Sequence, residues 1–126
     1  MKLLVIKTNN TVKAVEIYTK ISNEIQWTDI RKLLSHHVES LYLNRISRLA
    51  YLYLMFVEKG AVELPINKLA TKLINDPTKI IHGNAVITRT DHLGTGSKIL
   101  AMDDNEIKKI IEHMSHYYGH NVELIK

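Results

Sequence analysis

The longest unbroken apolar segment of the sequence, Leu49–Val57, limits the possible folds more than any other feature. It is nine residues long, rich in aromatic side chains, and is followed by Glu58-Lys59-Gly60. A membrane span takes about 18–20 apolar residues, so this segment is too short to be one. Because odd and even positions are apolar alike, both faces of the segment must be buried. It therefore predicts a central β-strand.

Shorter segments predict the other strands. Met1–Lys7 and Thr11–Tyr18 are rich in Val, Ile and Leu and flank Thr8-Asn9-Asn10, where asparagine tolerates the left-handed backbone of a tight turn, so they predict a hairpin. Further predicted strands are Val38–Leu43, Ala61–Leu64 (a second hairpin with the central strand across Gly60, ended by Pro65), Ile80–Thr88, and Val122–Ile125 as a short edge strand or a docked tail.

Three segments have the 3,4 spacing of helices. The first begins at Thr28 or Asp29 and ends near His36, the second covers Ile66–Ile74 before Asn75-Asp76-Pro77, and the third follows the capping pattern Asp103-x-x-Glu106 to about Tyr118. Together the elements predict a single small α+β domain over residues 1–126, with an antiparallel or mixed sheet of about five or six strands and three helices, mostly on one face.

The composition of the chain excludes several classes of protein. The chain has 126 residues, with 17 Lys and Arg against 13 Asp and Glu, and a net charge of +4. A protein that imitates DNA needs a dense negative surface, so that function is excluded. The absence of cysteine excludes disulfides and thiolate metal sites and favours a reducing cytoplasm. We find no secretory signal and no membrane span.

One face of a sheet with so few helices is expected to stay open. Leu41, Leu43, Tyr51 and Tyr53 are candidates for an apolar surface there. A homo-oligomer, at least a dimer, is the usual way to cover such a face, so we expect one.

The motifs between Leu52 and Thr88 follow a recognisable order. A strand, a turn with Gly60 and a strand ending in Leu64-Pro65 precede the helix motif Asn67-x-x-Ala70-Thr71 and a strand with Ile80, Gly83 and Ala85-Val86. This order resembles a small-protein family of unknown function common in bacteriophages and mobile elements. The resemblance implies a phage-type accessory protein in the cytoplasm of a bacterial host, and such proteins are often regulators or inhibitors of host defence.

Candidate binding residues lie near predicted element ends. Asn67 caps its helix or binds a ligand at the helix start, and capping is favoured. The segment Arg89–Lys98 contains Gly94 and Gly96 and lacks the spacing of a nucleotide-binding P-loop. It is either a solvated loop or one whose Arg89, His92 and Lys98 close on a phosphate-bearing molecule, with Arg89 the first candidate.

A second group of candidates surrounds the central strand. Arg45 and Arg48 precede it, and Tyr51 and Tyr53 share one of its faces, as in sheets that stack on RNA, although a core or subunit-interface stripe is favoured. Trp27 is either a hydrophobic staple at its helix start, which is favoured, or a residue that stacks on a ligand base.

No residue set in the sequence combines a nucleophile, a base and a metal site, so we expect no enzyme, no cofactor and no metal. Two hypotheses remain for function. The first is a non-catalytic counter-defence binder that sequesters an anionic nucleotide immune signal, its motivation being the phage-like resemblance and the basic charge. The alternative is a nucleic-acid-associated or protein-binding regulator that uses Tyr51, Tyr53, Arg45 and Arg48.

Overall fold

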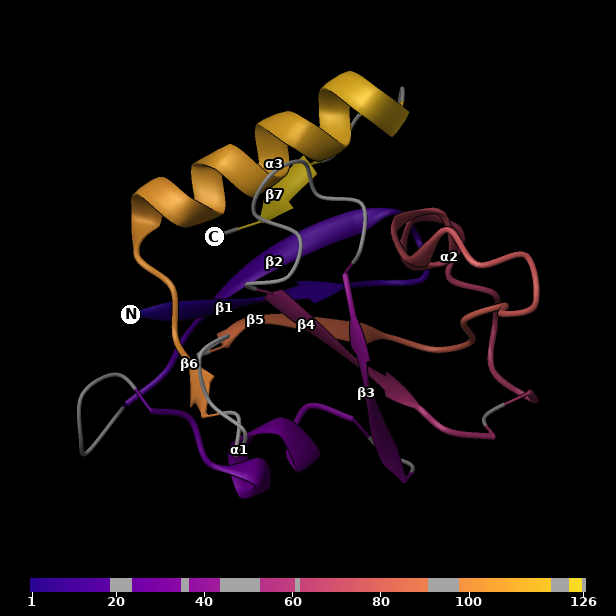
Figure 1. Cartoon of the computed structure of the whole chain (residues 1–126), viewed down its shortest axis with the longest axis horizontal. Coiled ribbons are helices and arrows are strands. Elements are labelled where there is room, and N and C mark those ends of the chain that lie inside the picture. Colours follow the sequence, from indigo (N-terminus) through magenta and orange to yellow (C-terminus); the bar gives the residue numbers. More distant parts are fainter. Residues whose placement is uncertain are drawn as a thin grey trace.

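The central strand predicted from the apolar run is present as β4 (Tyr53–Glu58), and all six of its residues are buried. The structure, a computed structural model, describes residues 1–18, 24–34, 37–43, 53–60, 62–90, 98–118 and 123–125. β4 lies between β3 (Val38–Tyr42) and β5 (Ala85–Thr90) and is antiparallel to both (Figure 1). Neighbours on both edges and a core on both faces explain why its sequence is apolar as far as Val57.

The predicted N-terminal hairpin is confirmed. β1 (Lys2–Ile6) pairs antiparallel with β2 (Thr11–Glu16), and Asn10 takes a positive φ of 67° in the turn between them. β7 (Glu123–Ile125) adds to the outer edge of β2 in parallel, which confirms the edge-strand alternative for the C-terminal segment. The sheet order is β3-β4-β5-β1-β2-β7, with the two-residue β6 (Ile99–Leu100) beside β5.

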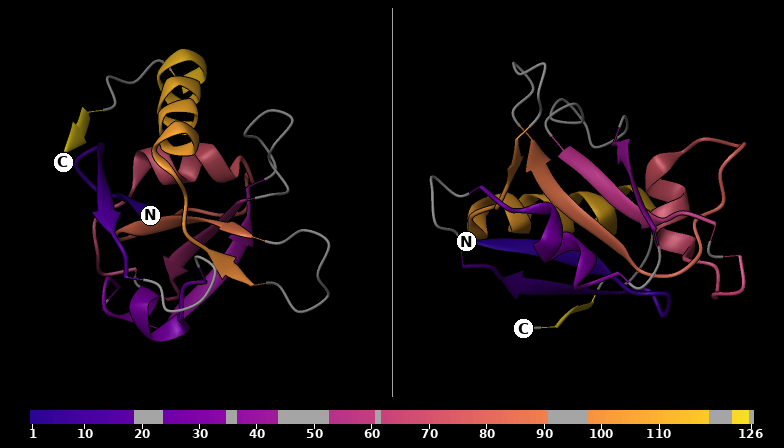
Figure 2. Two further views of the ribbon diagram at one scale, coloured as in Figure 1. Left: turned by 90° about the vertical axis from the view of Figure 1, so that its left-hand side faces the viewer. Right: turned by 90° about the horizontal axis from the view of Figure 1, so that it is seen from below.

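The three helices of the described residues cover the sheet. α2 (Lys68–Ile74) and α3 (Asp104–Tyr118) lie on one face, and α1 (Trp27–Arg31) lies on the other (Figures 1 and 2). The predicted class, an α+β domain with a mixed sheet and three helices, is confirmed. In the described part of the chain, no helix combines the length and the apolar character that crossing a membrane requires.

The expectation of an open sheet face is wrong for the described residues. Successive residues of β1 alternate between two cores, because neighbouring side chains of a strand point to opposite faces. Leu4 and Ile6 join the core under α2 and α3, and Leu3 and Val5 join the core under α1. Tyr53 is only 3% exposed within its own chain, so it is not part of an open surface. Leu43 is buried in the same core, and Leu41 packs against it, whereas Tyr51 lies outside the described residues.

Residues 62–64 do not form the predicted second hairpin. They make turns, because both edges of β4 are already occupied by β3 and β5 and no position remains for another strand beside it. The chain instead bonds to the segment before β5, where the Gly83 N–H donates to the Pro65 carbonyl (2.8 Å) and the Asn67 N–H to the Ile81 carbonyl (2.7 Å).

Two other element boundaries differ from prediction. Gly83 has a φ of 80°, which delays the start of β5 to Ala85, and the strand continues through Arg89 to Thr90. α1 begins one residue before the predicted cap and ends at Arg31, well before His36. Its N-cap is Gln26, and Asp29 acts at the third helical position, where its carboxylate accepts a hydrogen bond from the Gln26 N–H (3.1 Å).

Candidate functional site

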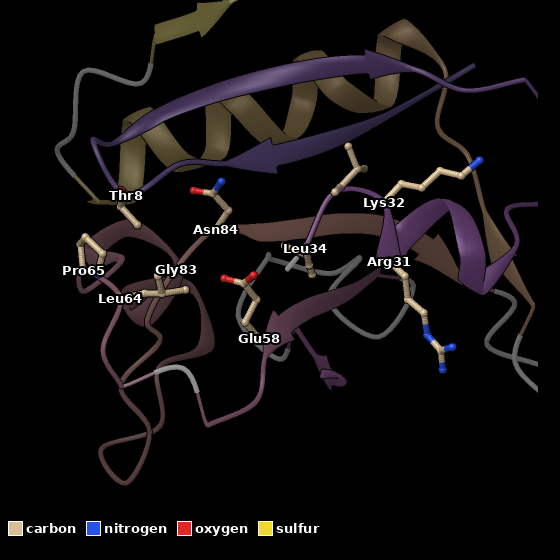
Figure 3. Close-up of a pocket in the computed structure, with 10 residues that line it drawn as sticks. Thr8, Arg31, Lys32, Leu34, Glu58, Leu64, Pro65, Gly83 and Asn84 are labelled. Carbon is tan, nitrogen blue, oxygen red and sulfur yellow. The ribbon is translucent and has the colours of Figure 1, made fainter. Parts of the chain in front are cut away.

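A pocket of about 500 Å³ opens on the α1 side of the sheet, at the end of β4 (Figure 3). Four separate parts of the chain meet there: the β1–β2 turn, the end of α1, the end of β4, and the paired segments around Pro65 and Gly83. Its lining residues are Thr8, Arg31, Lys32, Leu33, Leu34, Glu58, Leu64, Pro65, Gly83 and Asn84.

Asn67 organises one wall of this pocket from behind. Its side chain is fully buried, its Oδ1 accepts a hydrogen bond from the Ala70 N–H (3.0 Å), and its Nδ2 donates to the carbonyls of Ile6 (2.9 Å) and Gly83 (3.0 Å). Its amide therefore caps α2 and also connects β1 to the segment before β5 that contains Gly83. The capping prediction is confirmed, and the alternative that Asn67 binds a ligand directly is wrong, because the side chain is inaccessible and makes three hydrogen bonds within the chain.

Thr71 and His82 complete this wall. The Thr71 hydroxyl donates to the Asn67 carbonyl (2.8 Å) and accepts from the Ile81 N–H (2.9 Å), and His82 Nδ1 lies 2.8 Å from the Leu64 carbonyl oxygen. The motif residues between Pro65 and Gly83 thus form one hydrogen-bonded network that holds the wall in place. They act on the pocket through its backbone and not as contact residues.

Among the described lining residues, Glu58 is the charged group that is buried in the pocket. It ends β4 and is only 7% exposed, and its carboxylate points into the cavity between Gly83 and Leu34 (Figure 3). Glu58 also interacts within the chain. A methyl group at Gly83 would overlap the Glu58 carboxylate and come within 2.9 Å of Leu64 Cδ1, so glycine at this position leaves the space that the carboxylate occupies.

Cationic and polar side chains surround the mouth of the pocket. Arg31 and Lys32, at the end of α1, are exposed, and their side chains extend outward, away from Glu58 (Figure 3). Thr8 and Asn84 add a hydroxyl and an amide from the opposite side. The pocket therefore has an acidic interior and a basic rim, which are complementary to a ligand with donors at one end and negative charge at the other.

Arg89, the first candidate of the sequence analysis, lies on the other face of the sheet. Its guanidinium is 3.3 Å from Glu106 Oε1 of α3, and the Tyr53 hydroxyl donates to Glu106 Oε2 at 3.3 Å. Burial and then the negative charge of Glu106 raise the pKa of Tyr53 to about 12. This cluster joins β4, β5 and α3, so the structure supports a role in packing for Arg89 and does not place it at the pocket.

Of the remaining candidates, the structure describes Trp27 and Lys98. Trp27 packs edge-on against Phe56 of β4, with ring centroids 5.1 Å apart, and is 45% exposed on the face opposite Arg89. Lys98 is exposed next to β6, and its carbonyl accepts from the Thr90 hydroxyl (3.2 Å). His92, Arg45, Arg48 and the Gly94–Gly96 segment lie outside the described residues.

Sequence reasoning missed Glu58, Arg31 and Lys32 as pocket residues. A signal for Glu58 existed, because a carboxylate directly follows the most apolar segment of the chain and precedes Gly60. No comparable signal marks Arg31 and Lys32, since charged residues at the end of a short helix are typical of any solvated surface.

A second cavity, of about 350 Å³, lies between α3 and the β1–β2 hairpin. Its lining residues include Ala14, Ile107 and Ile111 together with Lys2 and Asp104, which form an ion pair (3.0 Å). Asp104 raises the pKa of Lys2. None of the described residues that line this cavity is a buried polar one, in contrast to the Glu58 pocket, which is therefore the stronger candidate.

The described residues contain no group of three or more His, Cys, Asp and Glu side chains that could hold a metal ion. Comparisons of the chain with protein-family models, with curated proteins and with solved structures found no match. Any assignment of function therefore rests on the chemistry of the pocket.

Proposed function

We propose that the chain is a non-catalytic binding protein that holds a small anionic nucleotide in the Glu58 pocket. The observation that carries the proposal is the pairing of a buried acceptor, Glu58, with a basic rim, Arg31 and Lys32, in one cavity. Its volume of about 500 Å³ is in the usual range of small-molecule sites, roughly 300–1,000 Å³. The base or ribose would lie inside, and the phosphates would lie at the rim, away from the Glu58 charge.

Arg31 and Lys32 suit the role of phosphate contacts. Their side chains are long and exposed, so they can turn toward a bound phosphate by changing rotamer without movement of the backbone. Hydrogen bonds between a guanidinium or ammonium and a phosphate are charge-assisted and stronger than neutral ones. A ligand would thus draw in two cations that extend into solvent in the structure.

The composition of the lining favours binding over catalysis. Among the described residues that line the pocket, Glu58 is the only carboxylate, and they include neither a histidine nor a second acid to complete an acid–base pair with it. Thr8 supplies a hydroxyl without a neighbouring base on the lining. The resemblance to phage small proteins extends the proposal: the bound nucleotide would be a signal of host defence, which the chain sequesters.

The alternative function, a nucleic-acid-associated regulator, is supported less well by the structure than by the sequence. Tyr53 is buried under α3 and cannot stack on a base, so the proposed aromatic surface is reduced to residues outside the described part of the chain. The two functions differ in salt dependence, since a site with six phosphate contacts weakens by a factor on the order of 10³ between about 50 and 200 mM salt. A pocket for one small nucleotide would weaken far less.

Arg31→Ala tests the proposed site by calorimetric titration with nucleoside monophosphates and cyclic dinucleotides. We expect the loss of about 1.5–3 kcal/mol of binding free energy, which is the contribution of a hydrogen bond to a charged group. The melting temperature should change little, because Arg31 is exposed.

Arg89→Ala is the matched control, because it removes the same charge from the opposite face of the sheet. We expect it to leave nucleotide affinity within a factor of about two, since long-range charge effects are screened at physiological salt. An affinity that falls in Arg89→Ala and not in Arg31→Ala would contradict the pocket and restore the site predicted from the sequence. Absence of binding by the unmodified protein to every nucleotide tested would contradict the proposed function.

A further inference from the structure

The hydrogen bonds between β3 and β4 show which backbone groups of β3 point away from the sheet. Just before β3, the His37 carbonyl accepts from the Lys59 N–H (2.6 Å). Just after it, the Leu43 N–H donates to the Tyr53 carbonyl (3.3 Å). The residues that exchange hydrogen bonds with a partner strand alternate along an antiparallel ladder. The odd-numbered residues of this segment therefore bond to β4, and the even-numbered ones do not.

The even-numbered residues of β3 are Val38, Ser40 and Tyr42. Each of them directs its N–H and its C=O toward the outer side of the strand. Among the described residues, no strand pairs with this side of β3, and Ser40 is exposed. These groups form an edge at which a strand of another chain can add.

The sequence of β3 does not protect this edge. Proteins commonly block a free edge with proline, with lysine or by making the edge strand very short. The five residues Val38–Tyr42 contain neither proline nor lysine, and their one charged residue, Glu39, belongs to the set that bonds to β4. At the other end of the described sheet, β7 has only three residues. β3 is therefore the longer of the two terminal strands.

We propose that this edge pairs with the same edge of a second copy of the chain, in an antiparallel dimer whose two-fold axis passes beside Ser40. The argument for a second copy is the symmetry of the edge. Val38 and Tyr42 lie two residues before and two residues after Ser40, so antiparallel pairing of two identical strands places Ser40 opposite Ser40, and Val38 opposite Tyr42. Every outward N–H and C=O of the three residues then has a partner, as an isologous interface requires.

Alternative registers satisfy the edge less well. A shift of two residues leaves the outward groups of Val38 or Tyr42 without a partner, and a shift of one places outward groups opposite residues that bond to β4. The symmetric register also places Glu39 opposite Leu41 of the second copy. The two Glu39 residues are then diagonal neighbours, so like charges do not lie directly opposite each other.

Ser40→Cys tests the register. The chain has no cysteine of its own, so a disulfide-linked dimer can form only through the new residue. Directly opposite residues of a hydrogen-bonded pair have Cα atoms about 5.5 Å apart, within the range of about 4.4–6.8 Å that disulfides span. We expect most of the oxidised variant to run as a covalent dimer in non-reducing electrophoresis at micromolar concentration.

Glu39→Cys is the matched control for cross-linking. It places the cysteine one residue away on the same strand, where the two copies are diagonal neighbours about 7–8 Å apart. We expect at least tenfold slower disulfide formation than in Ser40→Cys. Equal rates in the two variants would overturn the proposed register.

Ser40→Pro tests the edge itself by sedimentation equilibrium. Proline removes the outward N–H of Ser40, and edge strands tolerate it where the N–H faces away from the sheet. We expect the dimer dissociation constant to rise at least tenfold while the far-ultraviolet circular dichroism stays that of the unmodified protein. Ser40→Ala keeps the N–H and should dimerise like the unmodified protein.

The two experiments can each contradict the proposal. A folded Ser40→Pro that dimerises as tightly as Ser40→Ala would overturn pairing through β3. A monomer mass of the unmodified protein throughout the concentration series, with no rapid cross-linking of Ser40→Cys, would overturn self-association at this edge. If Ser40→Pro does not fold, the comparison of the two cysteine variants still decides.

Discussion

Glycine at position 83 illustrates how one residue can meet two requirements at once. Its φ of 80° lies in the left-handed region, which L side chains rarely adopt, and its missing side chain leaves room for the Glu58 carboxylate. Gly60 has a similar φ of 71°, but a Cβ placed there would meet nothing within 4 Å. A comparison of these two positions therefore separates the cost of a left-handed backbone from the cost of close packing.

Substitution of each glycine by alanine measures the two effects. For Gly60→Ala we expect a loss of about 1–2 kcal/mol in the free energy of unfolding, the cost of a left-handed backbone with a Cβ. Gly83→Ala should lose at least about 1 kcal/mol more, because the new methyl must also displace Glu58 or Leu64. Urea denaturation of the two variants provides the comparison, and equal losses would show that the space at Gly83 is not needed.

Among the elements, α3 is tied to the sheet by a polar contact as well as by apolar packing. Ile107, Ile110 and Met114 of α3 are buried in the core beneath it. At the edge of this core, Glu106 accepts hydrogen bonds from Tyr53 of β4 and from Arg89 of β5. The Tyr53 hydroxyl is thus removed from water and placed beside a carboxylate.

This environment predicts a loss of stability at alkaline pH. Because the pKa of Tyr53 rises from 10.0 to about 12, the folded chain holds the phenol proton more tightly than the unfolded chain does. The contribution is fully present below pH 10 and is lost as the pH rises through 12. We expect its size to be on the order of 1–2 kcal/mol.

Tyr53→Phe removes this titration and keeps the ring. The difference in unfolding free energy between the unmodified protein and Tyr53→Phe, measured by urea denaturation, should be constant below pH 10 and should shift in favour of the variant between pH 10 and pH 12. Parallel pH profiles of the two proteins over this range would contradict a raised pKa for Tyr53.

For the whole molecule, the described sheet ends at β3 on one side. Val38–Tyr42 pairs with β4 along one edge, and in the sheet order no described strand lies beyond it. An unpaired strand edge is a template on which another chain can add. This edge, and not an apolar face, is the feature of the described structure that would support the homo-oligomer expected from the sequence.

We predict that the protein is at least a dimer at micromolar concentration. Sedimentation equilibrium over a series of concentrations should give a mass above that of the 14.5 kDa chain, and the mass should fall toward that value on dilution. A monomer mass throughout the series would contradict the prediction. Nucleotide titrations at the same concentrations would show whether the pocket depends on the assembly.

Elements whose signals are local could be predicted from the sequence. The apolar run ending at Val57 predicted β4, the helical spacing of Leu69, Ala70 and Leu73 predicted α2, and Asp103 marked the start of α3, where its carboxylate accepts from the Glu106 N–H (2.8 Å). Hydrophobic periodicity and capping depend on residues a few positions apart, so they can be read without knowledge of the fold. The capping role of Asn67 belongs to the same class.

The places where these elements meet, and therefore the site, depend on the tertiary fold and could not be predicted from local patterns. Arg89 was a reasonable phosphate ligand in sequence, yet its strand register directs it to Glu106 on the face away from the pocket. Residues 62–64 do not form the predicted strand, because β3 and β5 already occupy both edges of β4. Glu58 and Gly83 are far apart in the sequence but are in contact in the structure. Contacts of this kind depend on the order of strands in the sheet, which no local pattern encodes.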